Sequence, residues 1–393
     1  MTHPTILLCM GTRPEIIKMV PVVVALRARG ADVQILHTGQ HTSMADPLYD
    51  FFAMRPQHVL LLERQKNDLA ELSAQLIERI APVLQQVKPA AVLVHGDTSS
   101  ALMAALAAFY EKIPIGHVEA GLRTHAKYDP FPEEKNRELI GRLAHWHFCP
   151  TPRAAHNLQT EGLTERIIVT GNTVIDAALQ TIKSIQRPTV GLSAEVDGLR
   201  QQWQTEVAGG NPCRMVLVTA HRRENWGPPI AAIALSMLNW LAQDESHRVV
   251  WPVHANPAVG GVVRRTLAGV SPALAQRFHC LPPVEYPELV WLLSQAWLVA
   301  TDSGGIQEEA TAFMTPVLVL RATTERPEIL ECGLGKLVGT DPQAINAALS
   351  LAQKKAVLPV SLRQNPFGDG HAGERIADRL LGDLHASAAS ASV

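Results

Sequence analysis

The sequence of residues 301–309 is Thr301-Asp302-Ser303-Gly304-Gly305-Ile306-Gln307-Glu308-Glu309. The apolar run Trp297-Leu298-Val299-Ala300 comes directly before it and predicts a buried strand, while Ser303 is a suitable N-cap for a helix over residues 306–313. Two adjacent glycines let the backbone approach a ligand closely, and the N–H groups and dipole at a helix start favour an anion such as phosphate. The stretch therefore predicts a strand, a turn and a helix, with a phosphate site at Ser303, Gly304 and Gly305.

Glu309 lies one to two turns inside the predicted helix. A carboxylate there would repel phosphate unless it faced a hydrogen-bond donor, so we expect Glu309 to bind a ribose diol, as acidic residues do in other nucleotide-binding folds. The alternative is a tight strand-to-helix connection followed by a solvated acidic face.

Length and composition predict an ordinary globular chain of two domains. The chain has 393 residues, of which 47% are hydrophobic and 18% charged, and 35 Lys plus Arg against 37 Asp plus Glu give a net charge of -2. This balance argues against general nucleic-acid binding. The start lacks the basic region of a signal peptide, and Gly11 and Arg13 interrupt the apolar run from Ile6. We therefore expect no membrane span and a cytoplasmic protein.

Cysteine and histidine spacing predicts no metal site. The five cysteines lie far apart, and none of the 16 histidines belongs to an H-E-x-x-H motif. We expect neither a metal nor a cofactor.

The first half begins with a strand over residues 6–10, followed by a loop and a helix from about Ile16 to Arg29. Pro14 suits the first turn of a helix, so Arg13 would lie at its N-terminus and Lys18 one turn inside it. Both cations could bind the same anion. The alternative is that both are surface charges.

Three acidic residues follow the next predicted strands or open a helix. Asp97 follows the strand at residues 91–94, Glu119 ends the strand at residues 115–119, and Glu133 follows Pro132 at a helix start. Strands alternating with helices predict a parallel sheet, which binds ligands at the carboxyl ends of its strands. These residues are therefore candidates for acid/base chemistry. The alternatives are an N-cap for Asp97, an ion pair with Arg123 for Glu119, and a favourable helix-dipole position for Glu133.

The alternation restarts in the second half, after a predicted boundary near residues 172–178 and a polar, glycine-bearing region over residues 184–211. The strand at residues 215–219 ends in Ala220-His221-Arg222-Arg223-Glu224-Asn225, which favours a cleft position for His221. Arg326 follows the strand at residues 316–320 and is a candidate phosphate ligand, because guanidinium can bind two oxygens at once.

Six motifs in this order resemble the non-hydrolysing UDP-N-acetylglucosamine 2-epimerases, from the first strand to about residue 370. They are Gly11-Thr12-Arg13-Pro14-Glu15-Ile16-Ile17-Lys18, His95-Gly96-Asp97-Thr98, His117-Val118-Glu119-Ala120-Gly121-Leu122-Arg123, Pro132-Glu133-Glu134, His221-Arg222-Arg223-Glu224-Asn225 and residues 302–309. The resemblance implies an α/β glycosyltransferase-B-type fold, with two Rossmann-like domains facing across a cleft. We expect an N-terminal domain over residues 1–175, a UDP-binding domain over residues 176–365, and a final helix at about 366–386 packing back on the first domain.

The resemblance also implies reversible C2 epimerisation of UDP-N-acetylglucosamine to UDP-N-acetylmannosamine. UDP would be eliminated to form 2-acetamidoglucal and then added back. The implied catalytic residues are Asp97, Glu119, Glu133 and His221. The implied UDP-binding residues are Arg13, Lys18, Ser303, Gly304, Gly305, Glu309 and Arg326.

Bacterial members of this family can bind a second UDP-sugar as an activator, at positions that resemble Gln40, His41, Glu134, Arg222 and His254. The chain departs from the family at Thr42-Ser43 and at Ala255. Members of this family are commonly homodimers, so we expect a homodimer.

The alternatives to this function are a 2-epimerase of a related UDP-2-acetamido sugar, a hydrolysing epimerase, a retaining glycosyltransferase and a protein that only binds the nucleotide.

Overall fold

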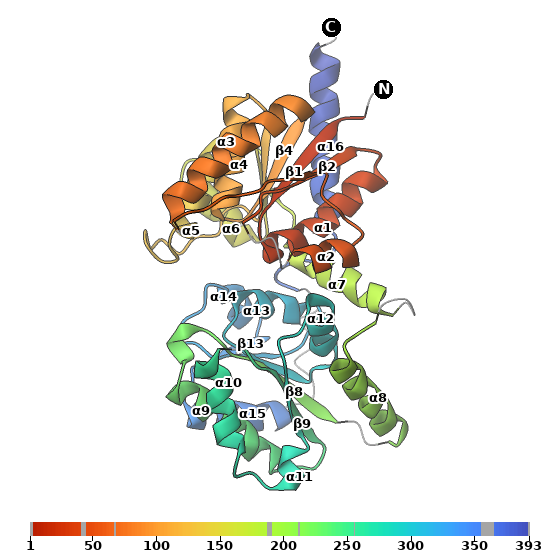
Figure 1. Cartoon of the computed structure of the whole chain (residues 1–393), viewed down its shortest axis with the longest axis vertical. Coiled ribbons are helices and arrows are strands. Elements are labelled where there is room, and N and C mark those ends of the chain that lie inside the picture. Colours follow the sequence, from red (N-terminus) through yellow and green to blue (C-terminus); the bar gives the residue numbers. More distant parts are fainter. Residues whose placement is uncertain are drawn as a thin grey trace. The chain divides into compact units, whose positions relative to one another are not determined.

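The computed structural model describes residues 3–40, 45–66, 68–186, 191–210, 213–254, 256–354 and 365–391. The chain divides into two compact units, unit 1 being Met1–Ala177 with Phe367–Val393 and unit 2 being Ala178–Pro366. Each unit has a parallel sheet with helices packed on it, which confirms the predicted two-unit α/β class (Figure 1). Among the described residues, none of the helices combines the length and the apolar character needed to cross a membrane.

The sheet of unit 1 has the strand order β3-β2-β1-β4-β5-β6-β7, and every described pair is parallel. The order changes direction between β1 and β4, because the chain builds outward from β1 on one side and then returns to build on the other. The strands are β1 (Thr5–Met10), β2 (Asp32–His37), β3 (His58–Val59), β4 (Ala91–His95), β5 (Ile115–Val118), β6 (Trp146–Cys149) and β7 (Ile167–Val169).

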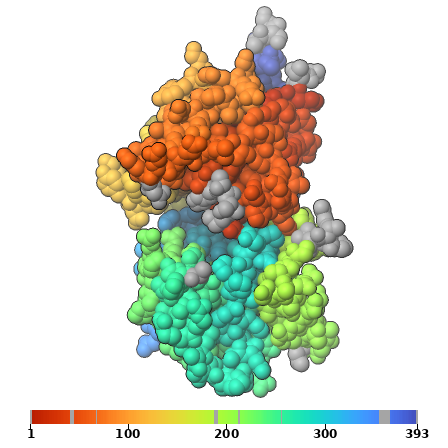
Figure 2. Space-filling view, in the orientation of Figure 1, coloured from red at the N-terminus to blue at the C-terminus, as the bar shows by residue number. Residues whose placement is uncertain are grey.

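The helices of unit 1 form where apolar stripes and N-caps coincide. In α3 the residues Leu72, Leu76, Ile80 and Leu84 recur every fourth position and are buried, and the Asp68 side chain caps the first turn. The helices are α1 (Arg13–Ala28), α2 (Asp46–Phe51), α3 (Leu69–Val87), α4 (Ser99–Tyr110), α5 (Glu133–Leu143), α6 (Pro152–Thr160), α7 (Thr173–Ile185), which continues into unit 2, and α16 (Ala372–Ala391). Figure 2 shows α3 in orange on the viewed face of unit 1.

The last helix, α16, packs against α1 within unit 1 (Figure 1). The two helices approach so closely that a Cβ on Gly373 would lie 2.7 Å from the carbonyl of Pro21. Arg29 Nη2 donates to Asp378 at 2.9 Å, and Trp146 Nε1 donates to Asp383 at 2.7 Å. The end of the sequence is therefore part of the N-terminal unit's core and surface.

The sheet of unit 2 repeats the pattern, with the strand order β10-β9-β8-β11-β12-β13, and it reverses between β8 and β11. The strands are β8 (Arg214–Thr219), β9 (His247–Pro252), β10 (Phe278–Leu281), β11 (Leu298–Thr301), β12 (Val317–Val319) and β13 (Gly335–Leu337). The helical elements are α8 (Ala194–Ala208), η1 (Arg223–Asn225), α9 (Pro228–Leu241), α10 (Pro257–Leu267), α11 (Pro272–Ala275), α12 (Tyr286–Gln295), α13 (Gly304–Thr311), α14 (Pro327–Glu331) and α15 (Pro342–Lys354).

The predicted polar region over residues 184–211 contains a helix, α8, that the sequence did not predict. Ser193 caps it by accepting from Val196 N, and Trp203 is buried and stacks on Trp291 of α12 with ring centroids 5.3 Å apart. Buried Val196, Leu199 and Trp203 anchor an otherwise polar helix, so tertiary packing outweighs a weak sequence pattern here.

Candidate active site

The strand order places the predicted site residues at the edge of each sheet that is formed by the carboxyl ends of its strands. Open α/β sheets bind ligands beyond the carboxyl ends of their strands, where the strand order reverses. In unit 1 this edge carries the loops after β1, β4 and β5, and therefore Arg13, Asp97 and Glu119. In unit 2 it carries the loops after β8 and β11, and therefore His221 and Ser303.

In unit 1 the loops after β1 and β4 are joined by Glu15, which the sequence analysis did not select. Its carboxylate is 1% exposed and accepts hydrogen bonds from Gly11 N at 2.9 Å, Thr12 N at 2.8 Å and the Thr98 hydroxyl at 2.7 Å. Burial raises the pKa of Glu15, and these hydrogen bonds act in the opposite direction. The signal was present, because Thr12 and Glu15 have the spacing of a capping box.

Gly11 sets how closely the first loop approaches its neighbours. A Cβ at this position would lie 2.2 Å from the Thr38 hydroxyl and 2.4 Å from the Ser100 hydroxyl, so a larger residue would displace both hydroxyls. Those two hydroxyls are 2.7 Å apart, and Ser100 donates to Gln40 Oε1 at 2.7 Å. Gln40 is thereby fixed beside the start of α1.

A cavity of about 400 Å³ in unit 1 brings three of the predicted residues together. Arg13, Gln40 and Glu133 all line it, along with Thr12, Pro14, Leu69, Thr98, Ser99 and Pro132. A larger cavity of about 640 Å³ in unit 2 is lined by residues of α7, α8 and α12 together with Phe313, and contains none of the predicted site residues. The smaller cavity is therefore the one that bears on the predicted site.

Glu119 follows β5 and forms an ion pair with Lys18 of α1. Its Oε2 also accepts from Asn172 Nδ2 at 3.1 Å and lies 3.8 Å from His95 Nε2. The predicted alternative partner, Arg123, instead binds Glu161 with distances of 2.6 and 2.8 Å, so that alternative was wrong. Burial lowers the pKa of His95 to about 4, so Lys18 supplies the positive charge next to Glu119.

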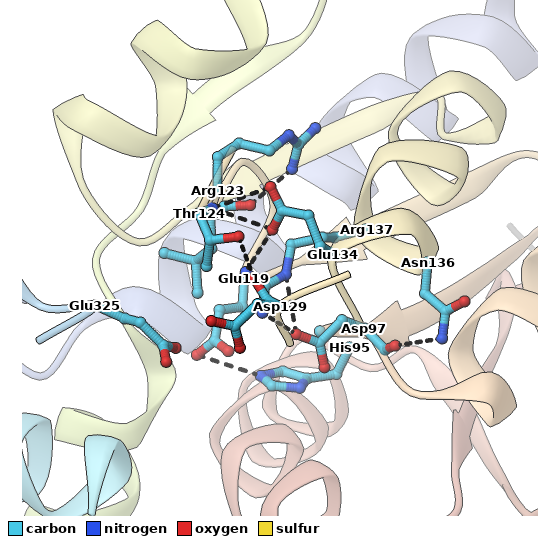
Figure 3. A network of polar contacts seen from close by, with 12 residues as sticks. His95, Asp97, Glu119, Arg123, Thr124, Asp129, Glu134, Asn136, Arg137 and Glu325 are labelled. Atoms are coloured by element: carbon cyan, nitrogen blue, oxygen red, sulfur yellow. Dashed lines mark hydrogen bonds and ion pairs between the residues drawn. The ribbon is translucent and has the colours of Figure 1, made fainter. Parts of the chain in front are cut away.

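Asp97 is held by Arg137 of α5, another residue that the sequence analysis did not select (Figure 3). Arg137 Nε and Nη2 both donate to Asp97 Oδ2, at 3.0 and 2.5 Å, and Asn136 Nδ2 donates to the Asp97 carbonyl at 2.8 Å. The N-cap of α4 is Thr98, which accepts from Ala101 N, so the predicted N-cap alternative for Asp97 was wrong. Asp97 is a carboxylate fixed at the end of β4.

Glu134 is completely buried, and its carboxylate faces the protein interior. It accepts from Thr124 N at 3.0 Å, from His125 N at 2.9 Å and from Arg137 Nη1 at 3.1 Å. Figure 3 shows Arg137 between Glu134 and Asp97. These contacts hold the loop after β5, and the contact of Glu134 with an activator stays a prediction.

In unit 2 the loop after β8 is held by Asp302, which is 0% exposed. Its Oδ2 accepts hydrogen bonds at 2.9 Å from His221 N, Arg222 N and Asn225 Nδ2. The His221 ring stacks on His254 with centroids 5.8 Å apart. Partial burial lowers the pKa of His221, against the opposing effect of Asp302, so the neutral imidazole is favoured.

The start of α13 is open. Ser303 is the N-cap residue, and a Cβ added to Gly304 or Gly305 would have no described protein atom within 4 Å. The two glycines are therefore not required by contact with neighbouring described segments. They leave room beside backbone N–H groups at a helix N-terminus, where an anion is favoured.

Arg326 lies at the N-cap position of α14 and forms an ion pair with Glu308 of α13, which is 1% exposed. Gln307 completes the link, since the Thr324 hydroxyl donates to its Oε1 at 2.7 Å and Thr324 in turn accepts from Arg326 N at 3.1 Å. Glu309 is 8% exposed on the same helix. Glu309 and Arg326 were predicted from the sequence, whereas Glu308, the residue that orients Arg326, was not.

The remaining positions are the other activator candidates and the residues at which the chain departs from the family. His254 is exposed and Arg222 is half-buried, and His41, Thr42, Ser43 and Ala255 lie outside the described residues. Within the described part of the chain, no three His, Cys, Asp or Glu side chains are grouped so that they could hold a metal ion.

Known proteins resemble this chain over almost its whole length. Residues 24–381 match the family model described as UDP-N-acetylglucosamine 2-epimerase. The UDP-N-acetylglucosamine 2-epimerase of Escherichia coli K12 is 41% identical over 380 residues, which cover 95% of this chain and 98% of the relative. That of Salmonella typhimurium is 41% identical over 379 residues, with 95% and 98% covered.

Two solved structures with bound nucleotide resemble the chain over almost its whole length. The UDP-GlcNAc 2-epimerase of Neisseria meningitidis bound to UDP-GlcNAc has a TM-score of 0.80 and 38% identity, with 96% of this chain and 100% of that chain covered. The Methanocaldococcus jannaschii UDP-GlcNAc 2-epimerase in complex with UDP-GlcNAc and UDP has a TM-score of 0.72 and 31% identity, with 96% and 99% covered.

Proposed function

The chain belongs to the UDP-N-acetylglucosamine 2-epimerase family and is an isomerase, and from this premise we propose that it interconverts UDP-N-acetylglucosamine and UDP-N-acetylmannosamine. The observation that carries the proposal is the pair of carboxylates Asp97 and Glu119. They follow the adjacent parallel strands β4 and β5, and each is paired with a cation. Such an arrangement suits proton removal and return at a single carbon.

The reaction proceeds by elimination and addition of UDP. Nothing beside C2 of the sugar stabilises a carbanion, so direct removal of the C2 proton is unfavourable. A base takes that proton while the C1–O bond to the diphosphate breaks, and the electron pair forms the C1–C2 double bond of 2-acetamidoglucal. An acid then protonates C2 on the opposite face, and the diphosphate oxygen bonds to C1 again.

The departing diphosphate is stabilised by the cations at helix starts. Arg13 and Lys18 lie in the first turns of α1, where the helix dipole adds to their charge. Arg326 plays the corresponding part in unit 2 and is oriented by Glu308. Lys18 has a second role, because its pairing with Glu119 favours the ionised carboxylate that a general base requires.

The acid/base set is Asp97, Glu119 and Glu133, with His221 as a neutral hydrogen-bonding group at the sugar. Glu133 is the first residue of α5 and lines the same cavity as Arg13, which supports its place near the C1 substituent. The uridine nucleotide binds unit 2, with its phosphates at Ser303, Gly304 and Gly305 and its ribose on Glu309. The open space at the start of α13 supports this part of the proposal.

A second UDP-sugar as activator and a homodimer are the finer parts of this proposal. The described candidates for the activator are Gln40 beside the cavity of unit 1, Glu134, Arg222 and His254. A sigmoidal rate dependence on UDP-N-acetylglucosamine, with no turnover of UDP-N-acetylmannosamine alone, is the result expected of activation. Simple hyperbolic kinetics in both directions would exclude it, and sedimentation velocity measures the oligomeric state.

Incubation with UDP-N-acetylglucosamine in D₂O tests the function. We expect deuterium at C2 of an intact UDP-sugar and a mixture of both epimers by NMR. Release of free N-acetylmannosamine with UDP would instead identify a hydrolysing epimerase. An unchanged substrate that is consumed only with an added acceptor would identify a glycosyltransferase, and nucleotide binding without any turnover would identify a binding protein.

A further inference from the structure

Asn172 lies just before the point where the chain leaves unit 1, and it contacts the segment where the chain returns to unit 1. It follows β7 and directly precedes α7, the helix in which unit 1 ends at Ala177 and unit 2 begins at Ala178. Its backbone N–H donates to the carbonyl of Phe367, the first residue of the returning segment, at 2.6 Å. Both residues are almost fully buried. The outgoing and returning segments are therefore hydrogen-bonded to each other at Asn172.

The contact between these two segments is a close approach of backbones. A Cβ on Gly171 would lie 3.3 Å from the Cα of Gly368, and a Cβ on Gly368 would lie 3.1 Å from the Cα of Gly171. Both glycines have positive φ, 89° and 123°, which side-chain-bearing residues rarely adopt. Residues 171–172 and 367–368, which we call the junction, leave little room for independent movement of either segment.

The Asn172 side chain connects the junction to Glu119. Its Oδ1 accepts from Val174 N at 3.0 Å in the first turn of α7, so the amide oxygen is occupied by the helix start. The amide orientation that follows directs Nδ2 at Glu119 Oε2, 3.1 Å away. Asn172 therefore presents a donor to the carboxylate, and this donor is fixed by two contacts to the backbone.

Lys18 and His95 also lie beside Glu119 Oε2, and each differs from Asn172 in what it offers the carboxylate. Lys18 has a second partner in the proposed reaction, since it also stabilises the departing diphosphate. His95 lies 3.8 Å away and is buried, where its charged form is disfavoured. The Asn172 amide carries no charge, and its contacts to Val174 N and to the Phe367 carbonyl hold it independently of Lys18.

We propose that Asn172 is a positioning residue for Glu119: it holds the carboxylate in a fixed orientation at the end of β5 and ties that orientation to the junction. This inference rests on the proposed function, in which Glu119 transfers a proton at C2. The hydrogen bond also favours the ionised form of Glu119, because an amide N–H donates to a carboxylate more strongly than to a neutral acid. Asn172 itself does not contact the reacting atoms.

Two substitutions of Asn172 remove the hydrogen-bond donor to Glu119 but keep an oxygen that can cap α7. Asn172→Ser keeps a side-chain oxygen that can cap α7 but is too short to reach Glu119. Asn172→Asp also keeps the capping oxygen and replaces the donor with a second carboxylate oxygen. We expect kcat to fall about 10- to 100-fold in Asn172→Ser and further in Asn172→Asp, with the Kd for UDP unchanged within about threefold. The acidic limb of the kcat–pH profile moves to higher pH in both, and further in Asn172→Asp.

The matched control is Asp176→Ala, one turn further along α7. The Asp176 carboxylate is 2% exposed and accepts from Gly373 N at 2.8 Å, so it joins α7 to α16. Asp176→Ala lowers the unfolding temperature but leaves the acidic limb of the pH profile where it is in the wild type.

The outcomes distinguish the inference from the function on which it rests. If the wild type does not exchange deuterium into C2, the proposed function fails. If the wild type does so, and Asn172→Ser keeps its rate and pH profile, only the positioning role is overturned. It is also overturned if Asn172→Ser loses rate in proportion to its loss of thermal stability while its pH profile stays in place, because that is the behaviour of a structural residue.

Discussion

Arg137 holds Asp97 through a single carboxylate oxygen, with Nε and Nη2 both donating to Oδ2 at 3.0 and 2.5 Å. Arg137 is 7% exposed and also donates to Glu134, so its position is fixed from two sides. Among the described residues, no side chain or backbone group donates a hydrogen bond to Asp97 Oδ1. One oxygen of this carboxylate is therefore anchored, and the other is left for the proton transfer that we propose.

Asp97→Asn should lower turnover at least about 100-fold, because an amide cannot exchange a proton with C2. UDP should still bind, since the proposed nucleotide contacts lie elsewhere. Steady-state kinetics and calorimetric titration with UDP measure the two effects separately. Arg137→Lys is the control: it keeps the positive charge but not the two parallel donors, and it should cost less than Asp97→Asn. Near-wild-type epimerisation by Asp97→Asn would remove Asp97 from the mechanism.

Glu134→Gln should loosen the loop after β5. The loss of the charge weakens the hydrogen bonds to Thr124 N and His125 N and leaves Arg137 with one anionic partner fewer, at a cost of about 1–3 kcal/mol. Tryptic cleavage after exposed Lys127, inside this loop, should become faster. Glu138→Gln on the same helix removes only a surface ion pair with Lys135 and should leave the cleavage rate unchanged. Equal cleavage rates in both variants would contradict this account of Glu134.

The sequence predicted the elements of the site better than the contacts between them. Gly11, Pro14 and the apolar pattern of α1 are local signals, and they correctly indicated a strand, a loop and a helix that presents Arg13. The partner of Glu119 was not predictable in this way. Arg123 is four residues away in sequence, yet Lys18, which pairs with Glu119, is separated from it by 101 positions and comes from the helix after β1.

The same limit explains the other missed residues. Arg137 reaches Asp97 because α5 packs next to α4, and Glu308 reaches Arg326 because α13 and α14 follow neighbouring strands. Such contacts depend on strand order and helix packing, which single-sequence patterns do not specify. The sequence indicated Asn172 only as the start of the predicted boundary near residues 172–178, and its link to Glu119 required the position of β5 relative to β7.

The stability of unit 1 should fall as the pH drops below about 6.5, because three buried histidines are neutral in the folded state. Burial lowers the pKa of His95 to about 4, of His117 to about 3 and of His147 to about 4. Between pH 6.5 and these values the unfolded chain binds protons that the folded chain does not. Each histidine therefore removes about 1.4 kcal/mol of stability per pH unit over that range.

Asp176 opposes this effect in a narrower range. Burial raises its pKa to about 6, so the folded state binds its proton first as the pH falls from 6 towards 3.8, and this offsets about one histidine. Thermal unfolding at pH 7.5, 6.0 and 5.0 should show a net decrease in the unfolding temperature. His117→Gln can still donate to the Gly96 carbonyl and should make the decrease shallower. An unchanged pH dependence in that variant would argue against the neutral histidines as its cause.

Asp302→Asn should damage the loop that carries His221. The Asp302 carboxylate accepts three hydrogen bonds with one oxygen while fully buried, and an amide accepts them more weakly, so we expect unit 2 to lose about 2–4 kcal/mol of stability. The loop then no longer holds His221 in one position, and kcat/KM should fall about 10- to 100-fold. Glu224→Gln in the same loop changes only a half-exposed ion pair with Arg321 and should remain close to the wild type in both measurements. If the two variants lost activity equally, general sensitivity of the loop would explain the effect, and the anchoring of His221 by Asp302 would not be needed.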